Sequence, residues 1–408
     1  MLQHSPGKAV FFYQFLGAHS LLIGLLPFFL PVYLWTRGLD LAAICLLTGV
    51  SGLAFCLSLG LWQKAASRWQ VKTLVILTFA LELGLIAVVG LFTALPGAAL
   101  QAAGSQTHNS VVLAALCIGL ANGAYNAFFW TTQRCLFLDL LGRNDTGRQY
   151  GNLQIIVSIF LKTGILAGGF LLDNGGFVWL LLLSAAVSLA AGIWLTYSSD
   201  SDVTVSVPAL PVTLRQSLVF SDNRGSRTVF LIDGIFLYLE SHFWTLSLFL
   251  VVRQDFSSLG VAVVLLALLF AVLFFILKNR VDSLPVAPVF KAAVLVYSLS
   301  WLLRMTLDHT AGGTYLLTAL IIITFCSSFF RLSFNKLFFD YARQTQSTSY
   351  LLVKSYASQC TLGVVFLVTG AVLLATPVLT ATALASSYAV AALFALLYLS
   401  YATGLTRV

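Results

Sequence analysis

Long apolar runs separated by short polar segments dominate the chain. Runs such as VAVVLLALLFAVLFFIL (261–277) hold no charged residue and lack the alternation of polar and apolar positions that a membrane β-strand shows. A spanning helix needs about 20 mostly apolar residues. The pattern therefore predicts about twelve membrane helices, at residues 9–35, 40–62, 73–95, 111–133, 150–172, 177–197, 228–252, 260–277, 289–307, 314–337, 351–375 and 380–402.

The composition indicates that lipid is the solvent of this chain. Of the 408 residues, 59% are hydrophobic and 9% are charged, whereas a soluble domain carries about 25% charged residues. In lipid every backbone polar group has to be hydrogen-bonded within the protein, which leaves helix bundles or closed barrels. The expected fold class is an all-α polytopic membrane protein with about 12 transmembrane helices.

The net charge of +8 is an orientation signal. Most of the 22 lysines and arginines fall in alternate loops on the side that holds both termini, among them Arg134 and Lys354, while the opposite loops hold Arg37, Arg253 and Arg304. By the positive-inside rule both termini are expected in the cytoplasm, and we expect a bacterial inner membrane. The basic loops offer contacts to membrane lipid, and no nucleic-acid partner is expected.

A polar stretch at 198–226 divides the predicted helices into two sets of six. It is rich in Ser, Asp, Val and Pro, which is typical of a linker. We therefore expect an N-terminal six-helix bundle at 1–197, a cytoplasmic linker at 198–226 and a C-terminal six-helix bundle at 227–408.

An internal repeat supports two pseudo-symmetric halves. FFWTTQRCLFLD (128–139) aligns with FFRLSFNKLFFD (329–340), which equates the fourth span with the tenth. Two halves related by an axis along the membrane normal are a transporter architecture. The identities pair Phe128, Phe129, Leu136, Phe137 and Asp139 with Phe329, Phe330, Leu337, Phe338 and Asp340.

Several segments resemble the major facilitator superfamily of transporters. IGLLPFFLPVYLW (23–35) resembles the end of that family's first helix, GILAGG (164–169) its glycine-rich fifth-helix motif, and GGFVWLLLLSAAVSLAAGIWL (175–195) the start of its sixth helix. The resemblance covers residues 9–200 well and the second half mainly through the repeat. It implies alternating access of two halves around a central cavity lined by the seventh helix.

The chain departs from the family's pattern at two positions. In GLWQKAASRW (60–69), Lys64 stands where the family's second loop has an aspartate, so the usual pairing of the cytoplasmic gate is not expected. Ile165 replaces the proline of the fifth-helix motif, so the motif's association with export does not carry over. The direction of transport stays open.

Three ionisable residues fall in the predicted span 228–252. Asp233 and Glu240 are two helical turns apart and share one face, whereas His242 points in another direction. An ionisable side chain near the bilayer centre costs about 2.5–3.5 kcal/mol on insertion scales, so a functional role is the default interpretation. Burial favours the neutral form of a carboxylic acid. We expect Glu240 to be the main protonation site; the alternative is a structural salt bridge to a neighbouring helix.

His19 joins Asp233, Glu240 and His242 as a proton-coupling candidate, because histidine titrates near neutrality. A packing role for His19 is the alternative. Lys162 lies deep in the fifth span, where it attracts an anionic substrate, pairs with an acid such as Glu82, or snorkels toward an interface.

Polar residues at helical spacing suggest a cavity lining for a small polar or zwitterionic organic solute. Asn and Ser in membrane helices also serve as contacts between helices, which is the alternative for several of these positions. The candidate substrate-binding residues are Gln14, Asn122, Tyr125, Asn126, Trp130, Lys162, Arg331 and Asn335.

The sequence contains no enzymatic motif. It has no Walker A sequence, no HExxH and no Gly-x-Ser-x-Gly elbow. The six cysteines predict neither a disulfide framework nor a metal site. We therefore expect a monomeric secondary transporter that is coupled to protons, has no enzymatic activity and uses neither cofactor nor metal.

Two other functional classes fit less of the sequence. A transporter-like membrane sensor or assembly partner without turnover is the main alternative, because the second-loop motif is eroded. A membrane-embedded transferase would require an acid or histidine cluster on a loop, and the sequence contains none.

Overall fold

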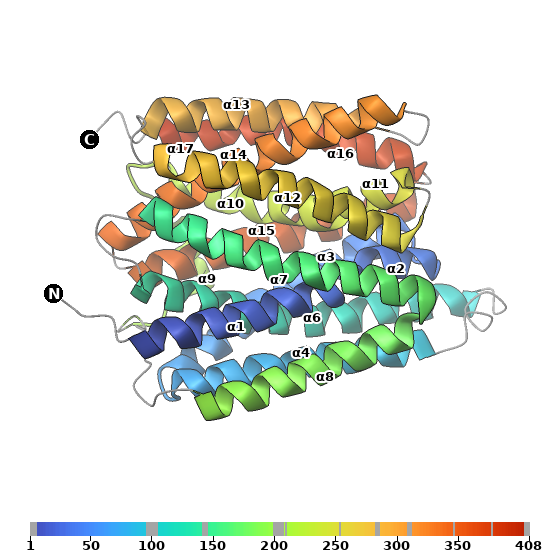
Figure 1. The fold of residues 1–408 in the computed structure, drawn as a ribbon, viewed down its shortest axis with the longest axis horizontal. Helices are drawn as coiled ribbons and strands as arrows, with labels where there is room; N and C mark the ends of the chain where they lie inside the picture. The colour runs from blue at the N-terminus through green and yellow to red at the C-terminus, as the bar shows by residue number, and fades with distance from the viewer. Residues whose placement is uncertain are drawn as a thin grey trace.

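The protein is a bundle of helices in which successive spans run in opposite directions between two ends of the molecule (Figure 1). The computed structural model describes residues 6–94, 105–140, 146–198, 208, 210–252, 254–281, 286–307, 312–345, 347–376 and 378–403. Helix α1 begins and helix α17 ends on the same side, which we call the terminal end; the other side is the distal end. Arg253 lies outside the described residues.

Six spans form the N-terminal bundle. The first span is broken into two helices, and the other five are single helices of 22 to 36 residues. The bundle consists of α1 (Pro6–Leu25), α2 (Leu30–Thr36), α3 (Leu41–Ala66), α4 (Val71–Ala94), α6 (Ser105–Leu140), α7 (Thr146–Asn174) and α8 (Phe177–Ser198).

Six further spans form the C-terminal bundle, after a short linker helix α9 (Leu214–Val219). The seventh and the last span each contain an irregular turn. The bundle consists of α10 (Ser226–Tyr238), a π-helical turn (Leu239–Phe243), α11 (Trp244–Val251), α12 (Phe256–Val281), α13 (Val286–Met305), α14 (Gly313–Gln344), α15 (Ser347–Ala375), α16 (Thr380–Ala395), a 3₁₀ turn (Leu396–Tyr398) and α17 (Leu399–Thr403).

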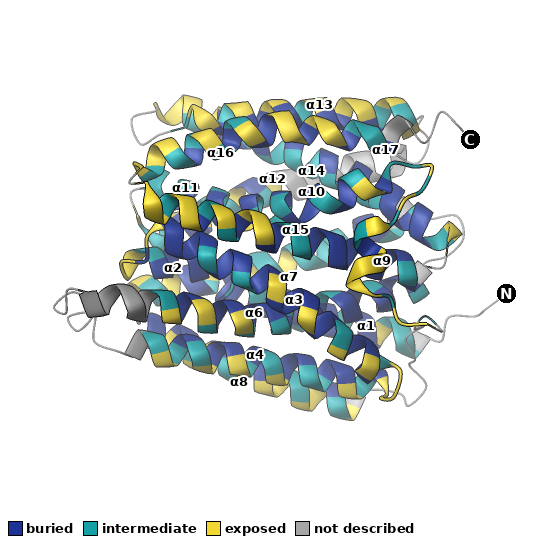
Figure 2. Ribbon diagram, turned by 180° about the vertical axis from the view of Figure 1, so that it is seen from behind, coloured by how far each residue is buried: buried dark blue, intermediate teal, exposed yellow. Residues whose placement is uncertain are grey.

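The predicted fold class is confirmed. Among the described residues, eleven helices are long and apolar enough to cross a membrane, and a shorter apolar stretch at Phe256–Leu268 belongs to the 26-residue helix α12. Apolar side chains are exposed on the outer faces of α4, α8, α13 and α16 (Figure 2), for example Leu91, Trp194, Leu295 and Leu393. Such faces are stable only against lipid tails.

Proline explains the break in the first span. Pro27 lies in the turn between α1 and α2 and has no backbone N–H to donate. Pro31 lies in the first turn of α2, where the missing N–H costs nothing. The predicted helix 9–35 is therefore two helices, Pro6–Leu25 and Leu30–Thr36.

Glycines allow the two bundles to approach each other. A Cβ at Gly52 of α3 would lie 2.7 Å from the carbonyl oxygen of Gln359 on α15, and one at Gly169 of α7 would lie 2.8 Å from that of Phe256 on α12. In lipid, helix association depends on such close packing, because lipid tails are as apolar as the side chains. These two helix pairs form the seams between the bundles.

Aromatic contacts also join the bundles at both ends. At the terminal end, Phe137 of α6 meets Phe339 of α14 with ring centroids 4.9 Å apart. Toward the distal end, Phe29, just before α2, packs near Phe256 at 6.1 Å, and Phe256 contacts Phe249 of α11 at 4.9 Å. Aromatic contacts between the bundles are therefore present both at the terminal end and toward the distal end.

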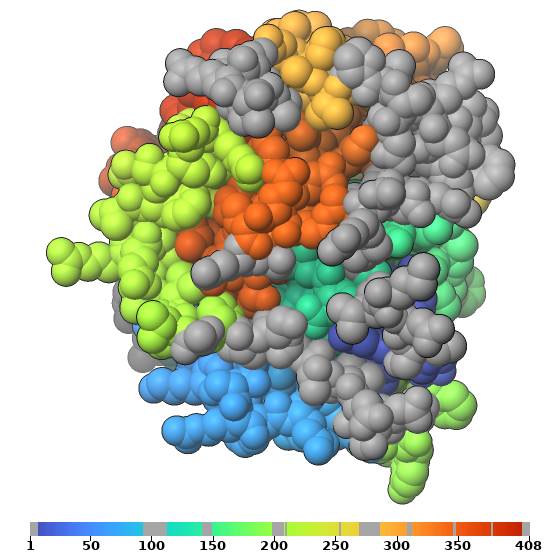
Figure 3. All heavy atoms as spheres, turned by 90° about the vertical axis from the view of Figure 1, so that its left-hand side faces the viewer, coloured from blue at the N-terminus to red at the C-terminus, as the bar shows by residue number. Residues whose placement is uncertain are grey.

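The linker crosses the terminal end of the molecule. Figure 3 shows linker residues lying beside the ends of α14 and α15 and close to those of α3 and α4. Gln63 of α3 accepts from the backbone N–H of Val212 (2.8 Å) and donates to the Val212 carbonyl (3.0 Å) and to the hydroxyl of Tyr356 on α15 (3.1 Å). Lys64, at the position of the missing aspartate, is exposed. Gln63 thus joins the linker and both bundles beside this position.

We predict that Gly164→Ala destabilises the protein. A Cβ at Gly164 would clash with the carbonyl oxygen of Leu21, where α1 and α7 cross. Overpacking of this kind costs roughly 1–3 kcal/mol, so the melting temperature of the purified protein should fall. Gly84→Ala is the matched control, since nothing lies within 4 Å of a Cβ there. Equal melting temperatures of the two variants would contradict the close crossing.

Candidate functional site

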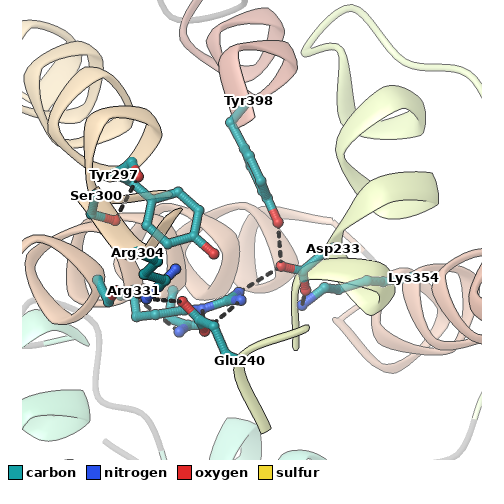
Figure 4. Close-up of polar contacts among 10 residues, drawn as sticks. Asp233, Glu240, Tyr297, Ser300, Arg304, Arg331, Lys354 and Tyr398 are labelled. Carbon is teal, nitrogen blue, oxygen red and sulfur yellow. Dashed lines mark hydrogen bonds and ion pairs between the residues drawn. The ribbon is translucent and has the colours of Figure 1, made fainter. Parts of the chain in front are cut away.

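A network of charged side chains lies in the C-terminal bundle, centred on Asp233 of α10 (Figure 4). Asp233 is 1% exposed and binds three donors. Its Oδ1 accepts from Arg331 Nη1 on α14 (2.8 Å) and from the hydroxyl of Tyr398 (2.7 Å), and its Oδ2 lies 2.8 Å from Lys354 Nζ on α15. A buried carboxylate with this many donors is stabilised as the anion, because each donor replaces a lost water.

Glu240 forms the second part of the network. Two nitrogens of Arg331 contact Glu240 Oε2, Nε at 3.1 Å and Nη2 at 3.0 Å. Since Nη1 of the same guanidinium binds Asp233, Arg331 bridges the two carboxylates. Arg304 Nη2 lies 3.9 Å from Glu240 Oε1. Glu240 Oε1 has no hydrogen bond within the described residues. The Glu240 side chain is 20% exposed, against 1% for Asp233.

The π-helical turn at Leu239–Phe243 carries Glu240 and His242. Such turns insert one residue into a helix and are frequent at functional sites. The extra residue alters the angular offset that a regular helix would give between Asp233 and Glu240, yet one arginine still reaches both. The ring of His242 stacks on Tyr238 with centroids 4.9 Å apart, and the side chain is buried.

Arg304 of α13 is 3% exposed. Its guanidinium carbon lies 3.8 Å from the ring centroid of Trp301 and 5.0 Å from that of Trp244, and Nη2 donates to Ser327 Oγ (2.7 Å). Indole faces attract a cation, most strongly when it is desolvated. The Nε and Nη1 atoms of Arg304 are buried and have no hydrogen-bond partner among the described residues.

The expectation that Arg304 and Lys354 are loop residues is therefore wrong. Arg304 lies inside the C-terminal bundle, and Lys354, 5% exposed, is eight residues into α15. The physical reason is ion pairing, because Glu240 and Asp233 supply the partners that make a buried cation tolerable.

A second polar cluster is buried in the N-terminal bundle. The hydroxyl of Tyr125 lies 3.1 Å from His19 Nδ1 and 3.4 Å from Glu82 Oε1, and the hydroxyl of Ser188 lies 3.2 Å from Glu82 Oε2. These four residues are at most 2% exposed. Glu82, one of the partners expected for Lys162, bonds to Tyr125 and Ser188 instead.

Aromatic rings enclose His19. The ring centroid of Phe129 is 3.4 Å away, and those of Tyr125, Phe79 and Phe15 lie at 5.3, 5.4 and 5.6 Å. His19 Nε2 is buried and has no hydrogen-bond partner among the described residues. The histidine is therefore held in one orientation by ring contacts and by the Tyr125 hydroxyl.

The predicted stripe on α6 is a chain of hydrogen bonds. Asn122 donates to Ser51 of α3 (2.9 Å), Asn126 donates to the side-chain oxygen of Asn122 (2.9 Å), and Trp130 Nε1 donates to Asn126 (2.9 Å). One turn further, Arg134 lies within α6 and not in the expected loop, and its guanidinium carbon is 5.8 Å from the Trp130 ring. Asn122 thus contributes to helix packing, while Asn126 and Trp130 remain partly exposed.

The remaining candidates are more dispersed. Asn335 donates to the backbone carbonyl of Arg331 (2.8 Å), which leaves its amide oxygen uncommitted among the described contacts. Lys162 of α7 is partly exposed, and no residue that the structure describes pairs with it. Gln14 of α1 is also partly exposed. The structure brings Asp233, Glu240 and Arg331 together and leaves His19 and Tyr125 in the separate N-terminal cluster.

Four members of the ionic network are not among the site residues predicted from the sequence. Tyr297 and Tyr398 both extend into it, together with Arg304 and Lys354 (Figure 4). The sequence does carry a signal for Lys354 and Arg304, because both are charged residues inside predicted apolar spans, 351–375 and 289–307. No comparable signal marks the two tyrosines, since tyrosine is common at membrane interfaces. Within the described residues, no group of three or more His, Cys, Asp or Glu side chains is arranged to hold a metal ion.

Solved transporter structures share this fold. A point mutant of the nucleoside transporter NupG matches with a TM-score of 0.65 at 15% identity, covering 98% of this chain and 99% of that chain. A bacterial homologue of the iron transporter ferroportin, in an outward-facing state, matches with a TM-score of 0.64 at 16% identity over 99% and 100% of the two chains. The POT family transporter PepTSo matches with a TM-score of 0.58 at 14% identity over 98% and 99%.

No curated protein matches the sequence. The sequence profile of the Major Facilitator Superfamily matches residues 16–355, most of both bundles. The resemblance found in the sequence is thereby confirmed, and the chain is an integral, multi-pass membrane protein of the transporter type. The chain belongs to the Major Facilitator Superfamily.

Proposed function

We propose that this protein moves a small polar or zwitterionic organic solute across the membrane by alternating access and that protons drive the movement. The observation that carries the proposal is the Asp233–Arg331–Glu240 network. Ionisable side chains inside a membrane bundle are expensive and mark pathways for substrates and protons. The side chains of Arg331 and Glu240 are 17% and 20% exposed, so both have surface that a solute or a proton donor can contact.

Glu240 is the proposed protonation site, and Asp233 the structural anchor. Asp233 satisfies both oxygens with three donors, whereas Glu240 retains an oxygen without a hydrogen bond among the described residues. The groups that face Glu240 are Arg331 of α14 and, on α13, Arg304 and Tyr297. A proton on Glu240 removes its charge, which weakens the ion pair and releases the Nε and Nη2 edge of Arg331.

The N-terminal cluster is a second candidate for proton movement. The single hydroxyl proton of Tyr125 points either to His19 Nδ1 or to Glu82, so a proton gained by one side reverses the direction of the hydrogen bonds. Among the remaining candidates, His242 has fewer polar partners, with Ser241 at 3.3 Å. We place His19 second to Glu240 as a coupling residue.

The proposed setting is a bacterial inner membrane, with the terminal end in the cytoplasm and the protein as a monomer. The basic loops support this orientation by the positive-inside rule. The proposed domains are residues 1–197 and 227–408, joined by the linker at 198–226, with the seams of α3 with α15 and of α7 with α12 as the surfaces that move.

We predict that Glu240→Gln removes the pH dependence of ligand binding. Amino acids, nucleosides and small organic acids would be screened by thermal shift in acidic and in mildly alkaline buffer. The native chain should be stabilised to different extents at the two pH values, and the variant to the same extent, because glutamine does not titrate. Asp255→Asn, at a partly exposed residue outside the network, is the control.

Flux measurements distinguish transport from sensing. The stabilising compound should enter proteoliposomes faster under an imposed proton gradient, and Glu240→Gln should abolish that acceleration. A compound that binds without flux would favour the sensor alternative. Binding that is equal at both pH values in the native chain would show that Glu240 is structural.

We predict that Asp233→Asn is much more destabilising than Tyr398→Phe. The first variant leaves Lys354 buried without its anion, and loss of one partner of a buried pair costs about 3–5 kcal/mol. The second removes one hydrogen bond, worth about 0.5–1.5 kcal/mol. Thermal unfolding in mild detergent measures both. Combining Asp233→Asn with Lys354→Met should restore part of the lost stability, because no buried cation is then left without its anion. An anchoring role for Asp233 would be contradicted if the double variant shows no recovery and if the two single variants lose equal stability.

A further inference from the structure

The centre of the molecule holds more cations than anions. The carboxylates of Asp233 and Glu240 are surrounded by Arg304, Arg331 and Lys354. Three cations therefore face two carboxylates before any contribution from the N-terminal bundle. A surplus positive charge in a low-dielectric interior is costly unless a counter-ion is supplied.

Arg134 adds a further positive charge from the N-terminal bundle. It lies about one helical turn before Phe137, whose ring meets that of Phe339 on α14 at 4.9 Å, so this face of α6 is turned toward the C-terminal bundle. The charge of Arg134 interacts there with those of Asp233 and Lys354. The ring of Tyr150 on α7 lies 6.1 Å from that of Phe137 and 5.7 Å from that of Phe339, and its hydroxyl interacts electrostatically with both Arg134 and Arg331. Arg134 and Arg331 thus approach the same region from opposite bundles.

The guanidinium of Arg134 forms no ion pair and no hydrogen bond with the described residues, and its carbon lies 5.8 Å from the ring centroid of Trp130. An arginine carries five N–H donors, which match the oxygens of a carboxylate or a phosphate. The N–H donors of the partly buried Arg134 are not used by protein groups, so they are available to a ligand. Lys162 of α7, also without a partner that the structure describes, adds a second unpaired cation to the N-terminal bundle.

We propose that the transported solute carries a negatively charged carboxylate or phosphate group, and that Arg134 binds this group on the N-terminal bundle opposite Arg331. This inference rests on the proposed transport function and narrows its substrate class. The anion supplies the counter-charge that the protein itself lacks. Because the two arginines belong to different bundles, α6 in one and α14 in the other, a bound anion links the two bundles.

The test is a thermal-shift panel at constant ionic strength on the purified full-length protein. Each anion is paired with an uncharged analogue: succinate with succinamide, benzoate with benzamide, and glucose 6-phosphate with glucose. At least one anion should raise the melting temperature saturably while its analogue does not. Arg134→Gln should weaken the apparent affinity for that anion at least about tenfold, as expected for loss of a charged hydrogen-bond donor.

Two further variants control for folding and for general charge. Arg134→Lys retains the positive charge and should recover part of the affinity, and Arg68→Gln, at an exposed arginine, should leave the affinity unchanged. The proposal is overturned if no anion of the panel stabilises the native chain, if an uncharged analogue stabilises it equally, or if Arg134→Gln binds the anion as well as the native chain does.

The outcomes also separate this inference from the transport proposal. An uncharged compound that binds and is then accumulated under a proton gradient would leave proton-driven transport in place and remove only the anionic substrate. An anion that binds through Arg134 but is not moved into proteoliposomes would leave the binding site in place and remove transport.

Discussion

Pairing of buried charge is the constraint on which the centre of this molecule depends. Asp233 is almost inaccessible to water, and it is tolerated there because Arg331, Lys354 and Tyr398 supply the donors that water would otherwise supply. These donors come from three different helical segments, α14, α15 and the last span. One carboxylate therefore fixes the relative positions of four spans of the C-terminal bundle.

The two halves share a helical repeat but differ in the chemistry of their interiors. In the N-terminal bundle, the carboxyl group of Glu82 meets the hydroxyls of Tyr125 and Ser188, and no ion pair is recorded within this cluster among the described residues. On the repeated helices, Trp130 of α6 takes the place of Arg331 of α14. Arg331 of α14 pairs with carboxylates of its own bundle. On α6 the arginine, Arg134, comes one turn further along, on a face that is turned toward the other bundle, where Phe137 meets Phe339. Pseudo-symmetry thus produces an asymmetric distribution of charge at the centre.

The order of residues along the chain is enough to indicate that lipid is the solvent, where the helices lie and which family the chain resembles. Runs of apolar residues long enough to span lipid leave the backbone few alternatives. The predicted spans therefore agree with the observed helices apart from the break near Pro27 and the irregular turns in the seventh and the last span. The same order marks Asp233, Glu240 and Arg331 as unusual, since a charge inside an apolar run is conspicuous without any knowledge of its partners.

Which charges meet is a property of the packed bundle. Lys354 and Arg304 fall close to the ends of predicted spans and are assigned from the sequence to the adjoining loops. Proximity to a helix end does not reveal whether a side chain turns outward or pairs with a carboxylate inside. The π-helical turn at Leu239–Phe243 and the contacts of Tyr398 likewise depend on packing between helices distant in sequence. Helical periodicity determines on which face of a helix a side chain lies. Which residue of another helix it meets on that face depends on how all the helices pack.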